Sequence, residues 1–148
     1  MRVVREVAVA AGPDALWALL WDVPRMVGCV PGCVDARAVE AGRRYAARMS
    51  QRVGPISLSV PLDVEIVEAE PPRRIALRAR GRDPRVGAEV VLRVVLACEP
   101  TEAGSALRVE ADGQVLGALG ALGHGVIQRR AEEAVDEFAA RLARAAAG

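Results

Sequence analysis

The sequence has no lysine and few aromatic side chains, with two Trp, one Tyr and one Phe among 148 residues. Its 20 basic residues are therefore all arginine, and 19 acidic residues balance them to a net charge of +1. With a net charge this close to zero, the protein has no overall electrostatic field that attracts nucleic acid, so we expect no nucleic-acid partner. The glycine-rich stretch 117–125 lacks the lysine and the preceding βαβ unit of a phosphate-binding loop, which disfavours nucleotide cofactors.

Cysteine and histidine are also scarce. The three cysteines, Cys29, Cys33 and Cys98, are odd in number and follow no secretory leader, which predicts reduced, buried thiols in a cytoplasmic protein. Cys29 and Cys33, even with the single histidine His124, match no common zinc spacing, so no metal site is expected. Arginine, aspartate or glutamate interrupts every apolar run before the roughly 18 residues that a transmembrane segment requires.

Alternating apolar and polar residues predict strands along most of a single domain, 1–148. The alternation is cleanest over 57–66. Similar patterns, separated by Gly and Pro, predict six further strands near 3–10, 33–40, 43–53, 73–81, 86–98 and 105–113. Pro61 lies inside a predicted strand and cannot donate a ladder hydrogen bond, so we expect an edge, a bulge or a bend there.

Three segments predict helices. Residues 13–21 are apolar nearly all round, and 25–30 form a second short helix or turn after Pro24. Residues 118–145 carry an apolar stripe at helical spacing, with Arg129 and Arg130 assigned to the opposite, polar face. The sequence therefore predicts an α+β fold, in which a seven-stranded curved antiparallel sheet grips a long C-terminal helix and two short helices follow the first strand.

Small side chains on the inward faces of the strands predict an apolar cavity between sheet and helix. Ala8, Ala36, Ala38, Ala47, Ala79, Ala88 and Ala111 fall at such positions. Ligand sites are usually concave and apolar, of order 300–1,000 Å³, although the sheet could instead approach the helix more closely and leave no space. The candidate ligand-binding residues are Trp17, Met26, Val30, Tyr45, Leu58, Leu77, Leu92, Leu116, Leu119, His124 and Ile127.

No set of residues predicts catalysis. His124 stands alone at the entrance of the long helix, where a histidine bonded to backbone or solvent is the more ordinary interpretation, and no catalytic residue is assigned. A cyclase would need inward polar groups, for which Tyr45, Gln51 and His124 are the candidates. An arginine stripe over 43–52 most simply faces solvent, with an acidic partner or lipid headgroups as the alternative.

Several short motifs in order resemble the carbon monoxide dehydrogenase CoxG subunit family, within the SRPBCC or START-like helix-grip superfamily that also contains polyketide cyclases. They are Trp17 to Asp22, Cys29-Val-Pro-Gly-Cys33, Val53-Gly-Pro-Ile56, Glu70-Pro-Pro72, Gly81-Arg-Asp83, and Gly117-Ala-Leu-Gly120 before a helix that carries Phe138. The resemblance covers nearly the whole chain.

This resemblance implies a helix-grip fold with a central apolar cavity. It implies an accessory protein to a molybdenum hydroxylase of the CO dehydrogenase type, which binds or carries a small hydrophobic ligand, quinone-like or lipid, and has no other cofactor. A cyclase or dehydratase-like enzyme and an assembly factor that binds a redox enzyme through its surface are the alternatives. Related proteins often add a membrane-seeking tail, whereas this sequence ends at Gly148, so peripheral membrane contact stays open.

Overall fold

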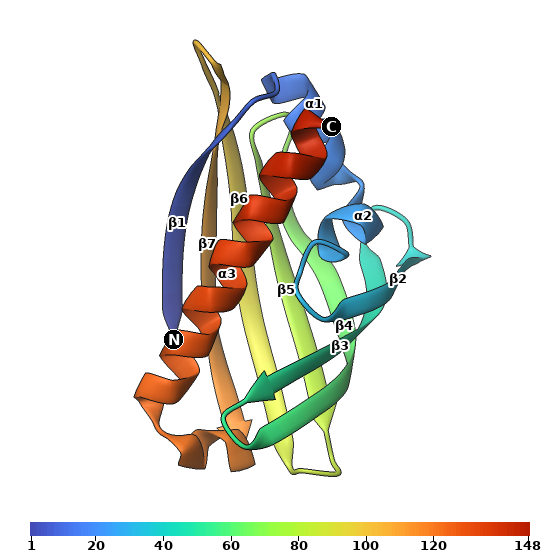
Figure 1. Cartoon of the computed structure of the whole chain (residues 1–148). Coiled ribbons are helices and arrows are strands. Elements are labelled where there is room, and N and C mark those ends of the chain that lie inside the picture. Colours follow the sequence, from blue (N-terminus) through green and yellow to red (C-terminus); the bar gives the residue numbers. More distant parts are fainter.

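Seven antiparallel strands form one curved sheet in the computed structural model, which describes residues 1–148 (Figure 1). The strands are β1 (Arg2–Val9), β2 (Cys33–Glu40), β3 (Arg44–Val53), β4 (Ile56–Glu70), β5 (Arg74–Asp83), β6 (Ala88–Thr101) and β7 (Gly104–Gly117). Their order across the sheet is β1-β7-β6-β5-β4-β3-β2. Consecutive strands β2 to β7 are therefore neighbours, and only β1 reaches its partner β7 from the far end of the sequence.

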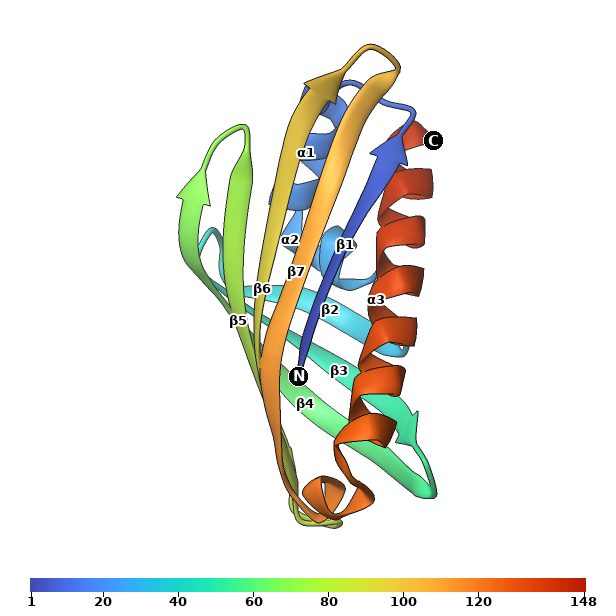
Figure 2. The ribbon, with the colours of Figure 1, turned by 90° about the vertical axis from the view of Figure 1, so that its left-hand side faces the viewer.

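Helices occupy the concave side of this sheet. They are α1 (Pro13–Trp21), α2 (Val23–Val27), the 3-10 helix η1 (Ala118–Leu122) and α3 (His124–Ala147). The long helix α3 runs across the concave face, as Figures 1 and 2 show. The predicted fold class, a curved sheet gripping a long C-terminal helix after two short ones, is confirmed.

The long helix begins later than the sequence predicted. Residues 118–122 form η1 instead, and α3 starts at His124 because Gly123 adopts φ 90°, outside the right-handed helical region. The second short helix lies at Val23–Val27 rather than 25–30, because Pro24 fits the first turn of a helix, where no N–H is needed.

Pro61 lies at the point where the sheet divides. The pairing of β4 with β3 extends over residues 44–65, but its pairing with β5 begins only at Leu62 opposite Gly81. Pro61 therefore has no strand partner on the β5 side, which confirms the edge position that its missing N–H predicted. Beyond this point β3 and the first half of β4 curve away from β5 and pass beneath α3 (Figure 2).

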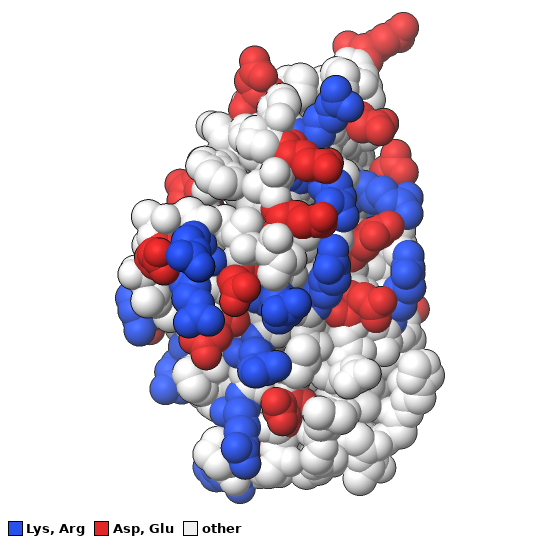
Figure 3. Space-filling model, turned by 180° about the vertical axis from the view of Figure 1, so that it is seen from behind, with Lys and Arg blue, Asp and Glu red and all other residues white.

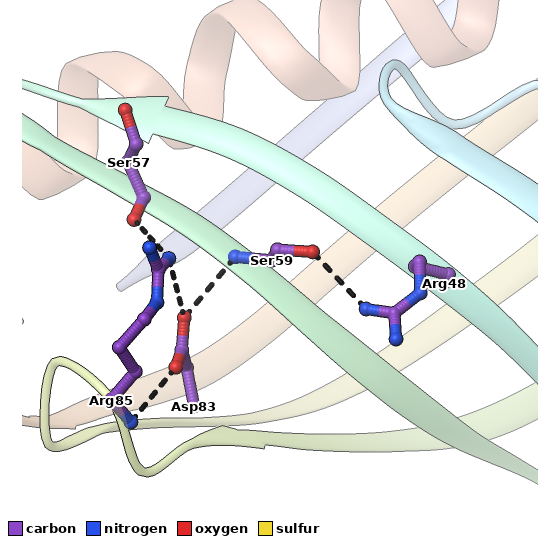
Figure 4. Close-up of polar contacts among 5 residues, drawn as sticks. All are labelled: Arg48, Ser57, Ser59, Asp83 and Arg85. Carbon is purple, nitrogen blue, oxygen red and sulfur yellow. Dashed lines mark hydrogen bonds and ion pairs between the residues drawn. The ribbon is translucent and has the colours of Figure 1, made fainter.

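A buried carboxylate bridges the opening that this division leaves. Asp83, only 4% exposed, accepts hydrogen bonds from the backbone N–H of Ser59 at 3.2 Å and of Arg85 at 3.0 Å (Figure 4). The Arg85 guanidinium binds the same carboxylate and the Ser57 carbonyl, both at 3.4 Å. The Ser59 N–H has no backbone acceptor on β5 and binds Asp83 instead. This hydrogen bond lowers the pKa of the Asp83 carboxyl, and Arg85 lowers it further.

The hydrophobic core consists of two separate clusters. The large one contains 26 buried residues between the sheet and the helices α1, α2 and α3. The small one, at the end where η1 lies, contains five: Val53, Leu58, Ala88, Val90 and Leu119. Between the two lies a part of the concave face that side chains do not fill.

The outer face of the sheet is charged. Acidic and basic side chains are mixed over much of this face, while its lower right part in Figure 3 is largely uncharged. Glu68, for example, pairs with Arg74 at 2.8 Å and with Arg93 at 3.4 Å. Such exposed pairs contribute little to stability. The hollow of the fold lies on the opposite, concave face of the sheet.

Candidate functional site

An apolar cavity of about 200 Å³ lies between the concave face of the sheet and α3. Its wall has 26 residues, of which 24 are hydrophobic. Four members of the small core cluster line it from one end, and members of the large cluster line it from the other. The cavity therefore separates the two halves of the core, and it is smaller than the 300–1,000 Å³ expected from sequence.

Every second residue of a strand faces the cavity, as the alternation of apolar and polar residues predicts. On β6 the inward residues are Val90, Leu92 and Val94, and on β5 they are Leu77 and Ala79. Met49, Gln51 and Val53 come from β3, Leu58, Leu62 and Val64 from β4, and Val109, Ala111 and Val115 from β7. The remaining wall is Met1, Met26, Val27, Val30, Cys33, Leu119, Ile127, Arg130, Ala131, Ala134, Val135 and Phe138.

The only two polar side chains of the wall are bonded to each other. The Arg130 guanidinium, on α3, donates to the Gln51 carboxamide oxygen, on β3. Gln51 in turn donates from its amide nitrogen to the Pro31 carbonyl, in the loop that precedes β2. We call this chain of three residues the polar bridge. It links α3 to β3 and to the loop before β2.

The opposite side of α3 is attached more firmly. Arg5 of β1 forms an ion pair with Asp136 at 2.7 Å, and Gln128 donates to the Arg2 carbonyl at 2.9 Å. Near the C-terminus, Arg25 of α2 donates to the Ala145 carbonyl at 3.3 Å. The polar bridge is thus the hydrogen-bonded link between α3 and β3, and its residues Gln51 and Arg130 are only half-buried. The cavity wall is therefore partly exposed where the polar bridge crosses it.

Seven of the eleven candidate ligand-binding residues lie on the cavity wall: Met26, Val30, Leu58, Leu77, Leu92, Leu119 and Ile127. The structure brings these together from β4, β5, β6, η1, α3 and the α2 region. That they bind a ligand stays a prediction. The other four, Trp17, Tyr45, Leu116 and His124, lie outside the wall.

Trp17 and Tyr45 are large side chains with other neighbours. In α1 the fully buried residues are Leu16, Leu19 and Leu20. Trp17 is half-buried, packs against the large cluster and stacks its ring on Trp21 with centroids 5.9 Å apart. Tyr45 is buried in the large cluster, and its hydroxyl accepts a hydrogen bond from the Gly42 N–H at 2.8 Å. That bond holds the ring in the β2–β3 turn, away from the cavity.

Leu116 and His124 lie at exposed positions. On β7 the inward residues are odd-numbered, such as Val109, Ala111 and Val115, so Leu116 points to the other face and is 45% exposed. His124 is the exposed first residue of α3. It therefore joins neither Tyr45 nor Gln51 in one pocket.

Sequence reasoning missed Arg130, which it assigned to the polar face of the helix. The signal was present, because Arg130 is three residues after Ile127 and four before Ala134, both on the wall, and residues three and four apart share a helix face. The alanine prediction also needs correction: of the inward alanines only Ala79 and Ala111 line the cavity, while Ala8 and Ala38 are exposed.

The thiols are not assembled for chemistry. All three cysteines are free, and Cys33 and Cys98 are buried as predicted, whereas Cys29, also predicted to be buried, is only partly buried in the turn after α2. Burial raises the pKa of Cys33, on the cavity wall, to about 11, because the thiolate loses its hydration there. No group of three or more His, Cys, Asp or Glu residues is placed to hold a metal ion. None of the helices combines the length and the apolarity that crossing a bilayer requires.

Comparison by sequence decides the family. Residues 6–147 match the family model of the carbon monoxide dehydrogenase CoxG subunit. This chain belongs to the CoxG family. The sequence motifs had predicted that membership, and the match covers the sheet from β1 to β7 as well as η1 and α3. No curated protein matches the chain. The CoxG family and the apolar cavity together support a helix-grip protein that binds a hydrophobic ligand.

Solved structures share the fold at low identity. A conserved protein from Geobacillus kaustophilus superposes with a TM-score of 0.86 at 16% identity, over 99% of this chain and 95% of its own. A protein from Thermus thermophilus superposes with a TM-score of 0.70 at 14% identity, over 99% of this chain and 97% of its own. The Zhui aromatase/cyclase from Streptomyces sp. R1128 superposes with a TM-score of 0.66 at 20% identity, over 100% of this chain and 92% of its own. At these identities the likeness concerns the fold.

Proposed function

We propose that this CoxG-family protein carries a small hydrophobic ligand with a quinone-like ring in its cavity, as an accessory to a molybdenum hydroxylase of the CO dehydrogenase type. The observation that carries the proposal is the cavity itself, apolar in 24 of its 26 wall residues and placed between the two core clusters. The family name supports the choice of enzyme partner.

An apolar space of this size is expensive to keep empty. Enclosed empty cavities in protein cores reduce stability, by about 24 cal/mol per Å³, so apolar space that side chains leave unfilled carries a cost. Net folding stabilities are themselves only about 5–15 kcal/mol. A larger side chain at Ala79, Ala111 or Ala134 would fill the cavity. That the cavity stays unfilled therefore favours a use in binding.

The volume limits the ligand to one or two rings. An apolar cavity of about 150 Å³ accepts benzene, so about 200 Å³ suits a ring with short substituents. A quinone ring meets this limit. Any isoprenoid tail would leave between α3 and β3, where the wall is half-exposed.

The geometry gives less support to the cyclase alternative. Acid-base chemistry on a bound chain requires polar groups that converge on the reacting atoms. Here the wall offers Gln51 and Arg130, which are bonded to each other, while Tyr45 and His124 lie elsewhere. An assembly factor that acts through the arginine stripe is also less supported, because two of its four arginines already pair with acids, Arg43 with Glu40 and Arg44 with Glu65.

The proposal predicts that filling the cavity abolishes quinone binding. Ala134 lines the cavity from α3, so Ala134→Phe would place a ring in the ligand space. The probe is 2,3-dimethyl-1,4-naphthoquinone, in which methyl groups block the ring carbons that cysteine thiols attack. Isothermal titration calorimetry should detect binding to the unmodified protein, and none to Ala134→Phe.

The matched control is Ala147→Phe, which adds the same ring at an exposed position at the end of α3. This variant should bind the quinone like the unmodified protein, and thermal melting should show that both variants fold. If the unmodified protein binds neither this quinone nor any apolar ring compound, the carrier proposal is wrong. Equal binding by Ala134→Phe would instead place the quinone outside this cavity.

A further inference from the structure

The polar groups at the half-exposed side of the cavity are all hydrogen-bond donors or already engaged. A guanidinium has five N–H donors and no acceptor. Arg130 uses its donors toward Gln51 and toward Glu133, whose carboxylate lies 3.6 Å away and is largely exposed. At least two N–H groups have no partner among these. The one side-chain acceptor on the wall, the Gln51 carboxamide oxygen, already receives Arg130.

The cation is held between the apolar space and water. The Arg130 side chain is 29% exposed, and its neighbours along the wall, Ile127, Ala131 and Ala134, are apolar. A charge at such a boundary is less hydrated than one on the open surface, so a ligand acceptor that reaches it gains more than in water. The same charge repels a ligand that carries an amine.

We infer that the cavity selects ligands with an apolar ring body and a hydrogen-bond acceptor, a carbonyl or carboxylate oxygen, at the end that faces Arg130. This inference rests on the proposed binding function and narrows its ligand class. The ligand acceptor binds an N–H group of Arg130 that neither Gln51 nor Glu133 uses. A quinone belongs to the class through one of its carbonyls, and aryl ketones and aryl carboxylates belong to it equally.

The test compares four naphthalene derivatives that differ only in one substituent. The probes are 2-methylnaphthalene, 2-acetylnaphthalene, 2-naphthoate and 2-naphthylmethylamine, titrated calorimetrically into the whole protein. The ketone and the carboxylate should bind about tenfold or more tighter than the methyl compound, the effect of one hydrogen bond to a charged group. The amine should bind more weakly than the methyl compound.

Two variants assign the preference to the guanidinium. Arg130→Met keeps an apolar stem but removes every donor of this side chain. The ketone should then bind no more tightly than the methyl compound, and the carboxylate, now an unpaired charge against an apolar wall, should bind more weakly. Gln51→Leu keeps the guanidinium and should retain the preference. The control is Arg129→Met, which removes the neighbouring exposed arginine, absent from the wall, and should behave like the unmodified protein. Thermal melting confirms that each variant is folded.

The outcomes separate the two proposals. If neither these probes nor 2,3-dimethyl-1,4-naphthoquinone binds, the binding function itself is wrong, and this inference falls with it. If the quinone binds but none of the four probes does, the acceptor inference is wrong. If 2-methylnaphthalene binds as tightly as the ketone and the carboxylate, the cavity binds rings but the acceptor inference is wrong. Retention of the preference in Arg130→Met, or its loss in Gln51→Leu, would also overturn the assignment to Arg130.

Discussion

Single glycines fix the backbone where the end of the sheet turns into η1. Gly117 has φ 78°, a conformation that side-chain-bearing residues rarely adopt. A Cβ at this position would also lie 1.8 Å from the Gly87 carbonyl oxygen, which accepts the Ala118 N–H. Both the conformation and the close approach require glycine, and together they direct η1 toward the cavity, where Leu119 is inserted.

Comparison with Gly42 separates these two requirements. Gly42 has a similar φ of 83°, but no atom lies within 4 Å of the position of its Cβ. Gly42→Ala should therefore lower the free energy of unfolding by about 1–2 kcal/mol through backbone strain alone. Gly117→Ala should lower it by clearly more, as urea denaturation can measure. Equal losses for the two variants would mean that the backbone near Gly87 moves aside without cost.

The helix α3 is held on the sheet by its apolar stripe more than by its charges. Leu142 is fully buried, and Val135, Phe138 and Ala139 are also buried along the same face. The predicted ion pair between Glu137 and Arg141 is present, but both side chains are largely exposed. Exposed pairs on a helix contribute only tenths of a kcal/mol, whereas a buried leucine contributes several.

Two neighbouring substitutions on α3 test this contrast. Leu142→Ala should reduce the free energy of unfolding by about 2–5 kcal/mol, because it removes buried apolar contacts. Arg141→Ala should reduce it by no more than about 0.5 kcal/mol. Denaturant titration of the two variants beside the unmodified protein gives both values. A comparable loss for Arg141→Ala would mean that the ion pair helps to hold the helix in place.

In the whole molecule, two of the cysteines differ in how far the packing around the cavity buries them. Cys33 lies on the cavity wall and is buried, whereas Cys29, in the loop before it, is only partly buried. Burial raises the pKa of both thiols, and near Cys29 the cations of Arg25, Arg141 and Arg144 oppose the rise. The pKa of the Cys33 thiol reaches about 11 from an ordinary value of 9.0.

Alkylation should follow this order in the folded protein. Only the thiolate reacts, and at pH 8 a pKa raised from 9.0 to about 11 makes the thiolate of Cys33 about a hundredfold scarcer. Iodoacetamide should therefore modify Cys29 first, and Cys33 far more slowly, as peptide mass spectrometry can follow. In urea all three cysteines should react at similar rates. Rapid labelling of Cys33 without urea would show that the cavity opens freely to solvent.

Local patterns predicted the elements and the fold but only part of the site. Alternation placed inward residues such as Leu58, Leu77 and Leu92 correctly, because a strand's period of two does not depend on the rest of the chain. It was misapplied at Leu116, one residue out of register with the inward set on β7. Gln51 and Arg130 of the polar bridge are 79 positions apart, and no local pattern joins them.

The sequence by itself determined which segments become strands and helices, and that one face of each is apolar, because these properties follow from periods of two and 3.6 residues. It also placed the chain in the CoxG family. Only the tertiary structure decided where the space remains, because that depends on how far β3 and β4 curve away from β5 at Pro61. The same curvature brings Gln51 against Arg130 and gives an apolar cavity one polar end.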